Sequence, residues 1–152
     1  KNDLLIIAKS YMGAKGSDAQ GMRSHYNRHC MPLVRPERRY EIQRDDNWCA
    51  MFTSVVASLA GYVESEFPFE VSVGEQVRIA RLRGTFISDW RKALAGDLVI
   101  FDWKSKGWPT HVGFVDSIVG NVMHTIEGNK DGKVGDRWVN LPNSQVMGFI
   151  RT

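Results

Sequence analysis

The sequence predicts an α+β fold in which N-terminal helices pack on an antiparallel β-sheet. Helix-like segments with start and stop signals occupy the chain before Gly96, and short apolar runs of strand length follow it. A doubly wound α/β fold would instead alternate the two kinds of segment. The length of 152 residues suits one domain with its own hydrophobic core, so we take residues 1–152 as a single domain.

The first part of the chain contains two predicted helices joined by irregular segments. Residues 3–11 have the spacing of a short amphipathic helix, and Gly13 is a typical stop signal. Residues 13–21 have the composition of a loop, and residues 22–30 that of a second helix. Residues 31–46 are rich in proline and arginine, which predicts irregular structure.

Two further helices carry clearer boundary signals. Residues 45–47 are Asp-Asp-Asn, a good capping sequence, and the apolar residues 48–59 behind them predict a buried helix. Ser72 followed by Glu75 is a capping-box pattern that opens a helix over residues 72–83. A glycine closely follows each of these segments, as expected at a helix C-terminus.

The last part of the chain predicts a set of short strands. Residues 97–102 enclose a continuous apolar run, which is typical of a buried strand. Residues 111–116 and 121–127 lie on either side of a glycine and predict a hairpin. Residues 138–141 and 147–150 would complete an antiparallel sheet.

Composition and charge limit the class of protein and its partners. No apolar run approaches the roughly 20 residues that span a bilayer, so no membrane partner is expected. The net charge is +3, and six arginines lie between Arg23 and Arg44. They indicate either attraction to an anionic polymer or an ordinary solvated basic face. No nucleic-acid-binding motif is present, so nucleic acid is not an expected partner, and we expect a monomer.

The two cysteines, Cys30 and Cys49, exclude a disulfide-rich scaffold. We expect both thiols to be free, because a bridge between them would silence a reactive Cys49. His25, His29 and Cys30 lie close together, but no spaced pair of ligands completes a usual zinc site. We therefore predict no metal and no cofactor.

Cys49 stands at the predicted start of the buried helix. Free backbone N–H groups and the helix dipole favour a thiolate at such a position. A thiolate there is a good nucleophile when a histidine pairs with it. A cysteine beside an apolar run is nevertheless more often an inert core residue, so the rest of a site is needed to indicate catalysis.

His111 begins the first strand of the predicted hairpin and supplies that second half. Glu127 lies on one face of the next strand, and Asn129 shares that face if the strand continues past residue 127, so both can lie beside His111. A carboxylate or amide there accepts the second imidazole N–H and orients the ring as a base. The alternative is a solvated hairpin with ordinary polar residues. A two-residue turn would place His111 opposite Gly128, so we predict an odd-length loop or a bulge near Gly120.

Four segments together resemble the motifs of the CHAP amidase/peptidase family, in order and spacing. They are Asn47-Trp48-Cys49-Ala50-Met51-Phe52, Gly96-Asp97-Leu98-Val99-Ile100-Phe101, His111-Val112-Gly113-Phe114-Val115 and Glu127-Gly128-Asn129. The resemblance covers residues 45–150 and implies a papain-like fold of the NlpC/P60 kind that cleaves peptidoglycan. It implies Cys49 as nucleophile, His111 as base, Glu127 as the orienting residue and Asn129 as its support.

The resemblance also has departures and open points. Several phage-lysin members of the family have a glutamine before the nucleophile, where this chain has Trp48, and Asp45 with Asp46 does not recreate their calcium loop. The Cys49 N–H is the expected donor to an oxyanion. Trp48, Trp103 and Trp108 are candidate substrate-binding residues, because aromatic faces suit sugars and peptides; for Trp103 and Trp108, an exposed loop with partial core packing is the alternative.

We expect the protein to be phage-encoded or secreted and to act outside the cell or at the bacterial cell wall. Its expected partner is peptidoglycan. Two other functions stay open. One is a cysteine amidase toxin or effector with a different amide target. The other is a catalytically inactive wall-binding module, which the rate of Cys49 alkylation at neutral pH would distinguish from an enzyme.

Overall fold

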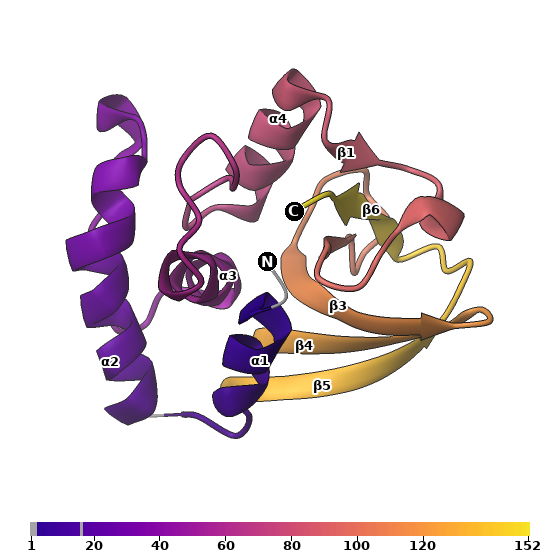
Figure 1. Cartoon of the computed structure of the whole chain (residues 1–152), viewed down its shortest axis with the longest axis horizontal. Coiled ribbons are helices and arrows are strands. Elements are labelled where there is room, and N and C mark those ends of the chain that lie inside the picture. Colours follow the sequence, from indigo (N-terminus) through magenta and orange to yellow (C-terminus); the bar gives the residue numbers. More distant parts are fainter. Residues whose placement is uncertain (1–2, 16) are drawn as a thin grey trace.

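The computed structural model describes residues 3–15 and 17–152 and confirms the α+β class. Helices come first and a six-stranded sheet follows, with strand order β1-β6-β2-β3-β4-β5 and antiparallel neighbours throughout. Figure 1 shows α3 nearly end-on, between α2 and the sheet. In the described part of the chain, no helix combines the length and apolar character needed to cross a membrane.

The elements have the following bounds. The α-helices are α1 (Asp3–Ser10), α2 (Ser17–His25), α3 (Cys49–Leu59) and α4 (Val73–Arg83). A π-helical turn, η1 (Tyr26–Cys30), continues α2, and the 3-10 turns are η2 (Met31–Leu33), η3 (Pro36–Arg38) and η4 (Trp90–Lys92). The strands are β1 (Phe86–Ile87), β2 (Leu98–Phe101), β3 (His111–Val119), β4 (Val122–Lys130), β5 (Lys133–Asn140) and β6 (Val146–Ile150).

The loop expected over residues 13–21 is wrong from Ser17 onward, because α2 begins there. Gly21 lies inside this helix, where a glycine costs up to about 1 kcal/mol relative to alanine. Ala19 and Met22 are buried in the core, and tertiary packing of this face outweighs the weak local preference. β1 is too short to show an alternating pattern and escapes prediction for that reason.

α3 is the central buried helix. Every residue from Cys49 to Ala57 is buried, as its apolar sequence predicts. Phe52 packs edge-on against Phe114 of β3, with 6.1 Å between ring centroids. A Cβ on Gly128 of β4 would lie 2.4 Å from the Cβ of Phe52, so only glycine allows this approach. The start of α3 is thereby held against β3 and β4.

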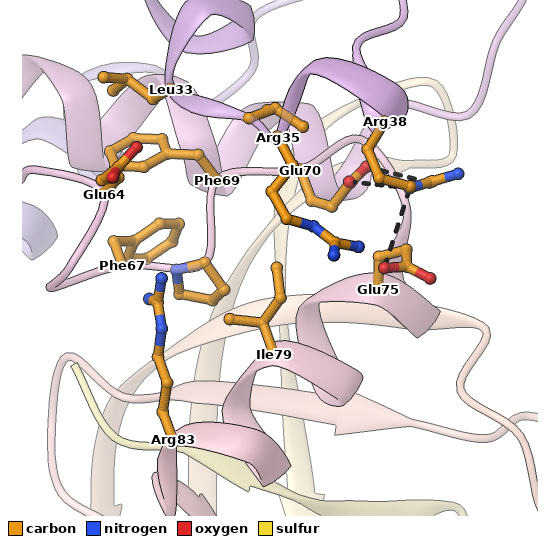
Figure 2. Close-up of a pocket in the computed structure, with 12 residues that line it drawn as sticks. Leu33, Arg35, Arg38, Glu64, Phe67, Phe69, Glu70, Glu75, Ile79 and Arg83 are labelled. Atoms are coloured by element: carbon orange, nitrogen blue, oxygen red, sulfur yellow. Dashed lines mark hydrogen bonds and ion pairs between the residues drawn. The ribbon is translucent and has the colours of Figure 1, made fainter.

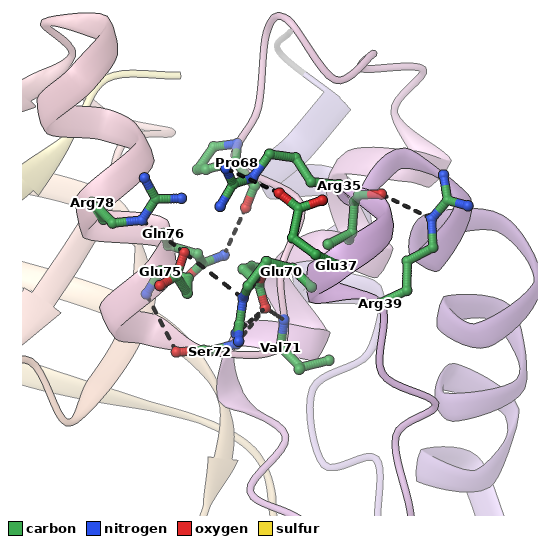
Figure 3. Close-up of polar contacts among 12 residues, drawn as sticks. Arg35, Glu37, Arg39, Pro68, Glu70, Val71, Ser72, Glu75, Gln76 and Arg78 are labelled. Atoms are coloured by element: carbon green, nitrogen blue, oxygen red, sulfur yellow. Dashed lines mark hydrogen bonds and ion pairs between the residues drawn. The ribbon is translucent and has the colours of Figure 1, made fainter.

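Glu70 ties the segment before α3 to the start of α4. Its carboxylate is buried and accepts hydrogen bonds from Arg38 at 3.3 and 3.4 Å and from the Val71 N–H at 3.0 Å (Figure 2; Figure 3 shows the Val71 contact). The predicted capping box is confirmed, since Ser72 Oγ accepts from the Glu75 N–H at 3.3 Å. A cavity of about 130 Å³ lies beside this cluster (Figure 2). Because Glu70 is satisfied from within the cluster, we assign Glu70 to the fold.

The pairing of β3 with β4 contains the expected bulge. Val119 pairs with Val122 across a two-residue turn, and the register then shifts at Asp116, so that Val115 pairs with Thr125. The bulge lies within β3 and not at the turn itself. The shift is what changes the parity of the pairing and brings the predicted site residues of the two strands onto the same face.

His124 of β4 lies on the strand face opposite Glu127 and has a structural environment. Its Nδ1 lies 2.9 Å from Asp116 Oδ2, and its Nε2 lies 2.6 Å from Asp136 Oδ2 of β5. Lys9 of α1 lies 2.8 Å from Asp116, so the cluster also attaches α1 to the sheet. Burial alone lowers the pKa of His124, but the two carboxylates outweigh it and raise that pKa above its usual value.

His124→Gln is expected to lower the free energy of unfolding by about 1 kcal/mol at pH 5.5, because an imidazolium between two carboxylates is lost. A raised folded-state pKa stabilises the protein fully below the unfolded pKa of about 6.5, and this contribution disappears as pH rises through the folded-state pKa. Urea unfolding of both proteins at pH 5.5 and 9 should therefore show a larger difference at pH 5.5. A difference that grows with pH would contradict this assignment.

Candidate active site

Cys49 is the first residue of α3, with 2% of its surface exposed, and its side chain lies close enough to His111 of β3 to raise the pKa of that imidazole. The N-terminus of α3 directs free N–H groups and the positive end of the helix dipole toward this sulfur. Trp48 stands at the N-cap position of α3 and makes no side-chain capping bond. The expected capping comes from Asn47, whose side-chain oxygen accepts a hydrogen bond from the Cys49 N–H at 3.3 Å.

His111 and Glu127 meet, because the bulge in β3 places both on the same face of the β3–β4 pair. His111 Nε2 lies 2.8 Å from Glu127 Oε1, which leaves Nδ1 for the contact with Cys49. The contact is diagonal, because the register after the bulge places Gly113 opposite Glu127. A Cβ on Gly113 would lie 2.5 Å from Glu127 Cγ, so the absent side chain is what lets Glu127 lean toward His111.

The charges of this group stabilise one another. Burial alone lowers the pKa of His111, but Cys49 and Glu127 outweigh burial and raise that pKa to about 9. Burial alone would raise the pKa of Glu127, but His111, Arg137 and Thr125 hold it below its usual value. At neutral pH the arrangement therefore favours an imidazolium held between the sulfur of Cys49 and an ionised Glu127.

Two residues of this group escape the sequence prediction. Arg137 Nε lies 2.6 Å from Glu127 Oε2, and Thr125 Oγ1 donates to the same oxygen. The Arg137 guanidinium also lies over the Trp103 ring, 4.5 Å from its centroid. The strand predicted over residues 138–141 begins one residue after Arg137. Thr125 pairs with Arg137 in the β4–β5 register, and this register, which the predicted strand does not specify, is what brings Arg137 to Glu127.

Asn129 has a different partner from the one expected. It follows Glu127 at a second irregularity in β4 and adopts φ 55°, and its Nδ2 donates to Asn47 Oδ1 at 3.0 Å. The Cys49 N–H donates to the same oxygen. Two N–H donors thus converge on one point beside the start of α3.

The three tryptophans occupy different environments. Trp48 is almost fully buried and lines a cavity next to the start of α3. Trp103 stacks on Phe101, with 4.3 Å between centroids, and lies 5.8 Å from the His111 ring. Trp108 is 56% exposed. Trp48 and Trp103 therefore border the candidate site, whereas Trp108 is a surface residue in an adjoining loop.

The remaining cysteine and histidines form no second centre. Cys30 is a free, buried thiol, and burial raises its pKa to about 12. His25 contacts Ser58 at 3.0 Å and lies against the His29 ring. Among residues 3–15 and 17–152, no group of three or more histidine, cysteine or acidic side chains is placed to hold a metal ion.

Comparison with known proteins supports the fold. No family model matches the sequence, and neither does any curated protein. A solved structure of an NlpC/P60 family protein from Bacillus cereus ATCC 10987 is similar, with a TM-score of 0.54 and 16% sequence identity. The alignment covers 99% of this chain and 39% of that one, so this chain spans about two-fifths of that protein's length. The similarity shows an α+β, papain-like fold.

Proposed function

We propose that this protein is a cysteine hydrolase that cleaves an amide bond of bacterial peptidoglycan, in the stem peptide, a crossbridge or the sugar–peptide link. The observation that carries the proposal is the buried Cys49–His111–Glu127 group at the start of α3. The CHAP-like motifs and the NlpC/P60-like fold support peptidoglycan as the substrate. A CHAP enzyme of phage or secreted origin, working as a monomer outside the cell or in the wall, is the form we propose.

The geometry supports a two-step acyl transfer. The Cys49 thiolate attacks the amide carbonyl and forms a tetrahedral oxyanion. When the C–N bond breaks, the His111 imidazolium gives its proton to the departing amine, and a thioester forms. Neutral His111 then takes a proton from water as the resulting hydroxide attacks the thioester. The acid leaves, and the thiolate–imidazolium pair is restored.

Asn47 and Asn129 suggest how the oxyanion is held. The Cys49 N–H and Asn129 Nδ2 donate to Asn47 Oδ1 at 3.3 and 3.0 Å, so this carbonyl oxygen lies where an oxyanion would receive two hydrogen bonds. We propose that the substrate oxygen displaces Asn47 Oδ1 during the reaction. Asn129 would then act on the reacting atoms and not on His111.

Asn129→Gly is expected to lower kcat by about 10²-fold, the usual effect of losing one oxyanion donor. Glycine suits the φ of 55° at this position, so the backbone is not strained. The Asn129 side chain donates its hydrogen bond to Asn47 and not to His111, so the rate of Cys49 alkylation should stay at the wild-type value. A parallel fall in kcat and alkylation would indicate that Asn129 supports the imidazole instead.

Digestion of purified peptidoglycan, with mass spectrometry of the products, tests the proposed function. We expect fragments with one new amine and one new carboxyl group, and their masses will identify the bond. Binding to walls without fragments would favour the inactive binding module. Fast alkylation of Cys49 with no wall products would favour an amidase with another target.

A further inference from the structure

A cavity of about 480 Å³ lies on the Trp48 side of the nucleophile. Three separate parts of the chain line it: α2, the segment before α3, and the β4–β5 turn. Its lining residues are Ala19, Gln20, Arg23, Arg44, Asp45, Trp48 and Gly132. Trp48 directly precedes Cys49, so the cavity lies next to the start of the helix that carries the nucleophile.

Arg23 is the unusual side chain in this cavity. It lies on α2 with only 8% of its surface exposed, and its guanidinium donates to Gln20 Oε1 at 2.9 Å. Within the described residues, no carboxylate lies within ion-pair distance of Arg23. The partly buried arginines Arg38 and Arg137, by contrast, each form an ion pair with a buried glutamate of their own. A buried cation without a counter-charge is costly, which indicates that an anion completes the site.

The other charged residues of the cavity favour an anion as well. Arg44 lies on the exposed rim, and within residues 3–15 and 17–152 it has no ion-pair or hydrogen-bond partner. Asp45 is the one acidic lining residue, and its side chain is exposed to solvent. The cavity is therefore lined by two arginines and one solvent-exposed aspartate, and Arg23 is the more buried of the two arginines.

We infer that this cavity is a subsite for a carboxylate of the substrate, bound by Arg23 with help from Arg44. The inference rests on the proposed function and narrows it to amides that carry a free carboxylate close to the bond cleaved. A guanidinium presents two parallel N–H donors that match a carboxylate, and burial strengthens the pair. Trp48 supplies the apolar wall against which the adjoining peptide packs.

A binding measurement tests the subsite separately from catalysis. The probes are N-acetyl-D-alanyl-D-alanine and the same dipeptide with a C-terminal amide, titrated into the Cys49→Ala protein and followed by NMR. We expect the carboxylate probe to bind about 10-fold or more tightly than the amide, the effect of one charge-assisted pair. Shifts should centre on Trp48 and Gly132. Equal affinity for the two probes would overturn the inference.

Substitutions of the arginines distinguish carboxylate binding in the cavity from a general attraction of anions to a basic surface. Arg23→Gln should reduce carboxylate binding about 10-fold and leave amide binding unchanged, and Arg23→Lys should recover part of the loss. Arg44→Gln, at an exposed position, should give a smaller reduction even if Arg23→Gln folds poorly. Arg28→Gln removes the same charge from an exposed neighbouring position that does not line the cavity, and it should have no effect. Equal losses in Arg28→Gln and Arg44→Gln would overturn the inference.

Hydrolysis of a matched pair of peptides, one with a carboxylate and one with a carboxamide beside the cleaved bond, links the subsite to catalysis. Wild-type protein should prefer the carboxylate by about 10-fold in kcat/KM, and Arg23→Gln should remove that preference while still cleaving the carboxamide peptide. Cleavage of neither peptide, with carboxylate-selective binding intact, would contradict the proposed function alone. Cleavage of both at equal rates would contradict the subsite alone.

Discussion

Cys49→Ala is expected to reduce the rate of wall hydrolysis by at least about 10⁴-fold, because the nucleophile is lost and only binding and oxyanion contacts remain. The fold should persist. Cys49 is buried at the start of α3, but alanine keeps the Cβ and is a better helix former than cysteine. The measurements are the rate of peptidoglycan clearing and the thermal unfolding curve of each protein.

Cys30→Ala is the matched control, because Cys30 is also a buried, free thiol. Its Sγ donates to the Ser54 carbonyl oxygen at 3.5 Å, and burial raises its pKa to about 12, so little thiolate exists at neutral pH. Clearing should survive this substitution. Iodoacetamide at neutral pH should label Cys49 and spare Cys30. If Cys49→Ala clears walls as fast as wild type, the proposed mechanism is wrong.

The parts of the fold that sequence predicts well are those set by local signals. α4 begins and ends where the capping box and the following glycine indicate, since both signals act within one helical turn. The buried α3 follows from its continuous apolar run. The Cys49, His111 and Glu127 trio follows from a helix start and from alternation along two strands. For His111 to share a face with Glu127, the pairing needed either an odd-length loop or a bulge near Gly120, and the structure has a bulge at Asp116.

The parts that escape prediction depend on contacts between distant residues. Asn47 and Asn129 are 82 positions apart, and no local pattern indicates that their amides meet. Arg137 reaches Glu127 only because β5 pairs with β4 in a register that the sequence does not specify. In the sequence, Arg23 is one of six arginines in a basic stretch and nothing distinguishes it from the others. Its place in a cavity beside Trp48 depends on how α2 packs.

Glu127→Gln is expected to lower kcat by about 10²–10³-fold and the free energy of unfolding by about 3 kcal/mol. Glutamine keeps the shape but removes the charge that faces both His111 and Arg137, leaving two cations without their buried counter-charge. The pKa of His111 should fall from about 9, so the alkaline limb of the kcat/KM profile should move to lower pH. Rates from pH 5 to 10 and urea unfolding measure the two effects.

The pH dependence of the stability difference has a defined sign. The depressed pKa of Glu127 contributes stability above its unfolded value of about 4.3, and this is lost as pH falls through the lower folded value. The raised pKa of His111 contributes fully below about 6.5 and is lost as pH rises toward about 9. The free energy of unfolding of the wild-type protein should therefore exceed that of Glu127→Gln by the largest amount between about pH 4.5 and 6.5.

Arg137→Gln is the matched control at the other end of the same carboxylate. It also breaks a buried ion pair and should destabilise the fold, but it leaves the 2.8 Å contact between Glu127 and His111 in place. Without the guanidinium, the charge of Glu127 acts more strongly on the imidazolium, so the alkaline limb should move to higher pH. Opposite shifts in the two variants are expected only if Glu127 sets the protonation of His111. Shifts in the same direction would mean that both substitutions act through general loss of packing.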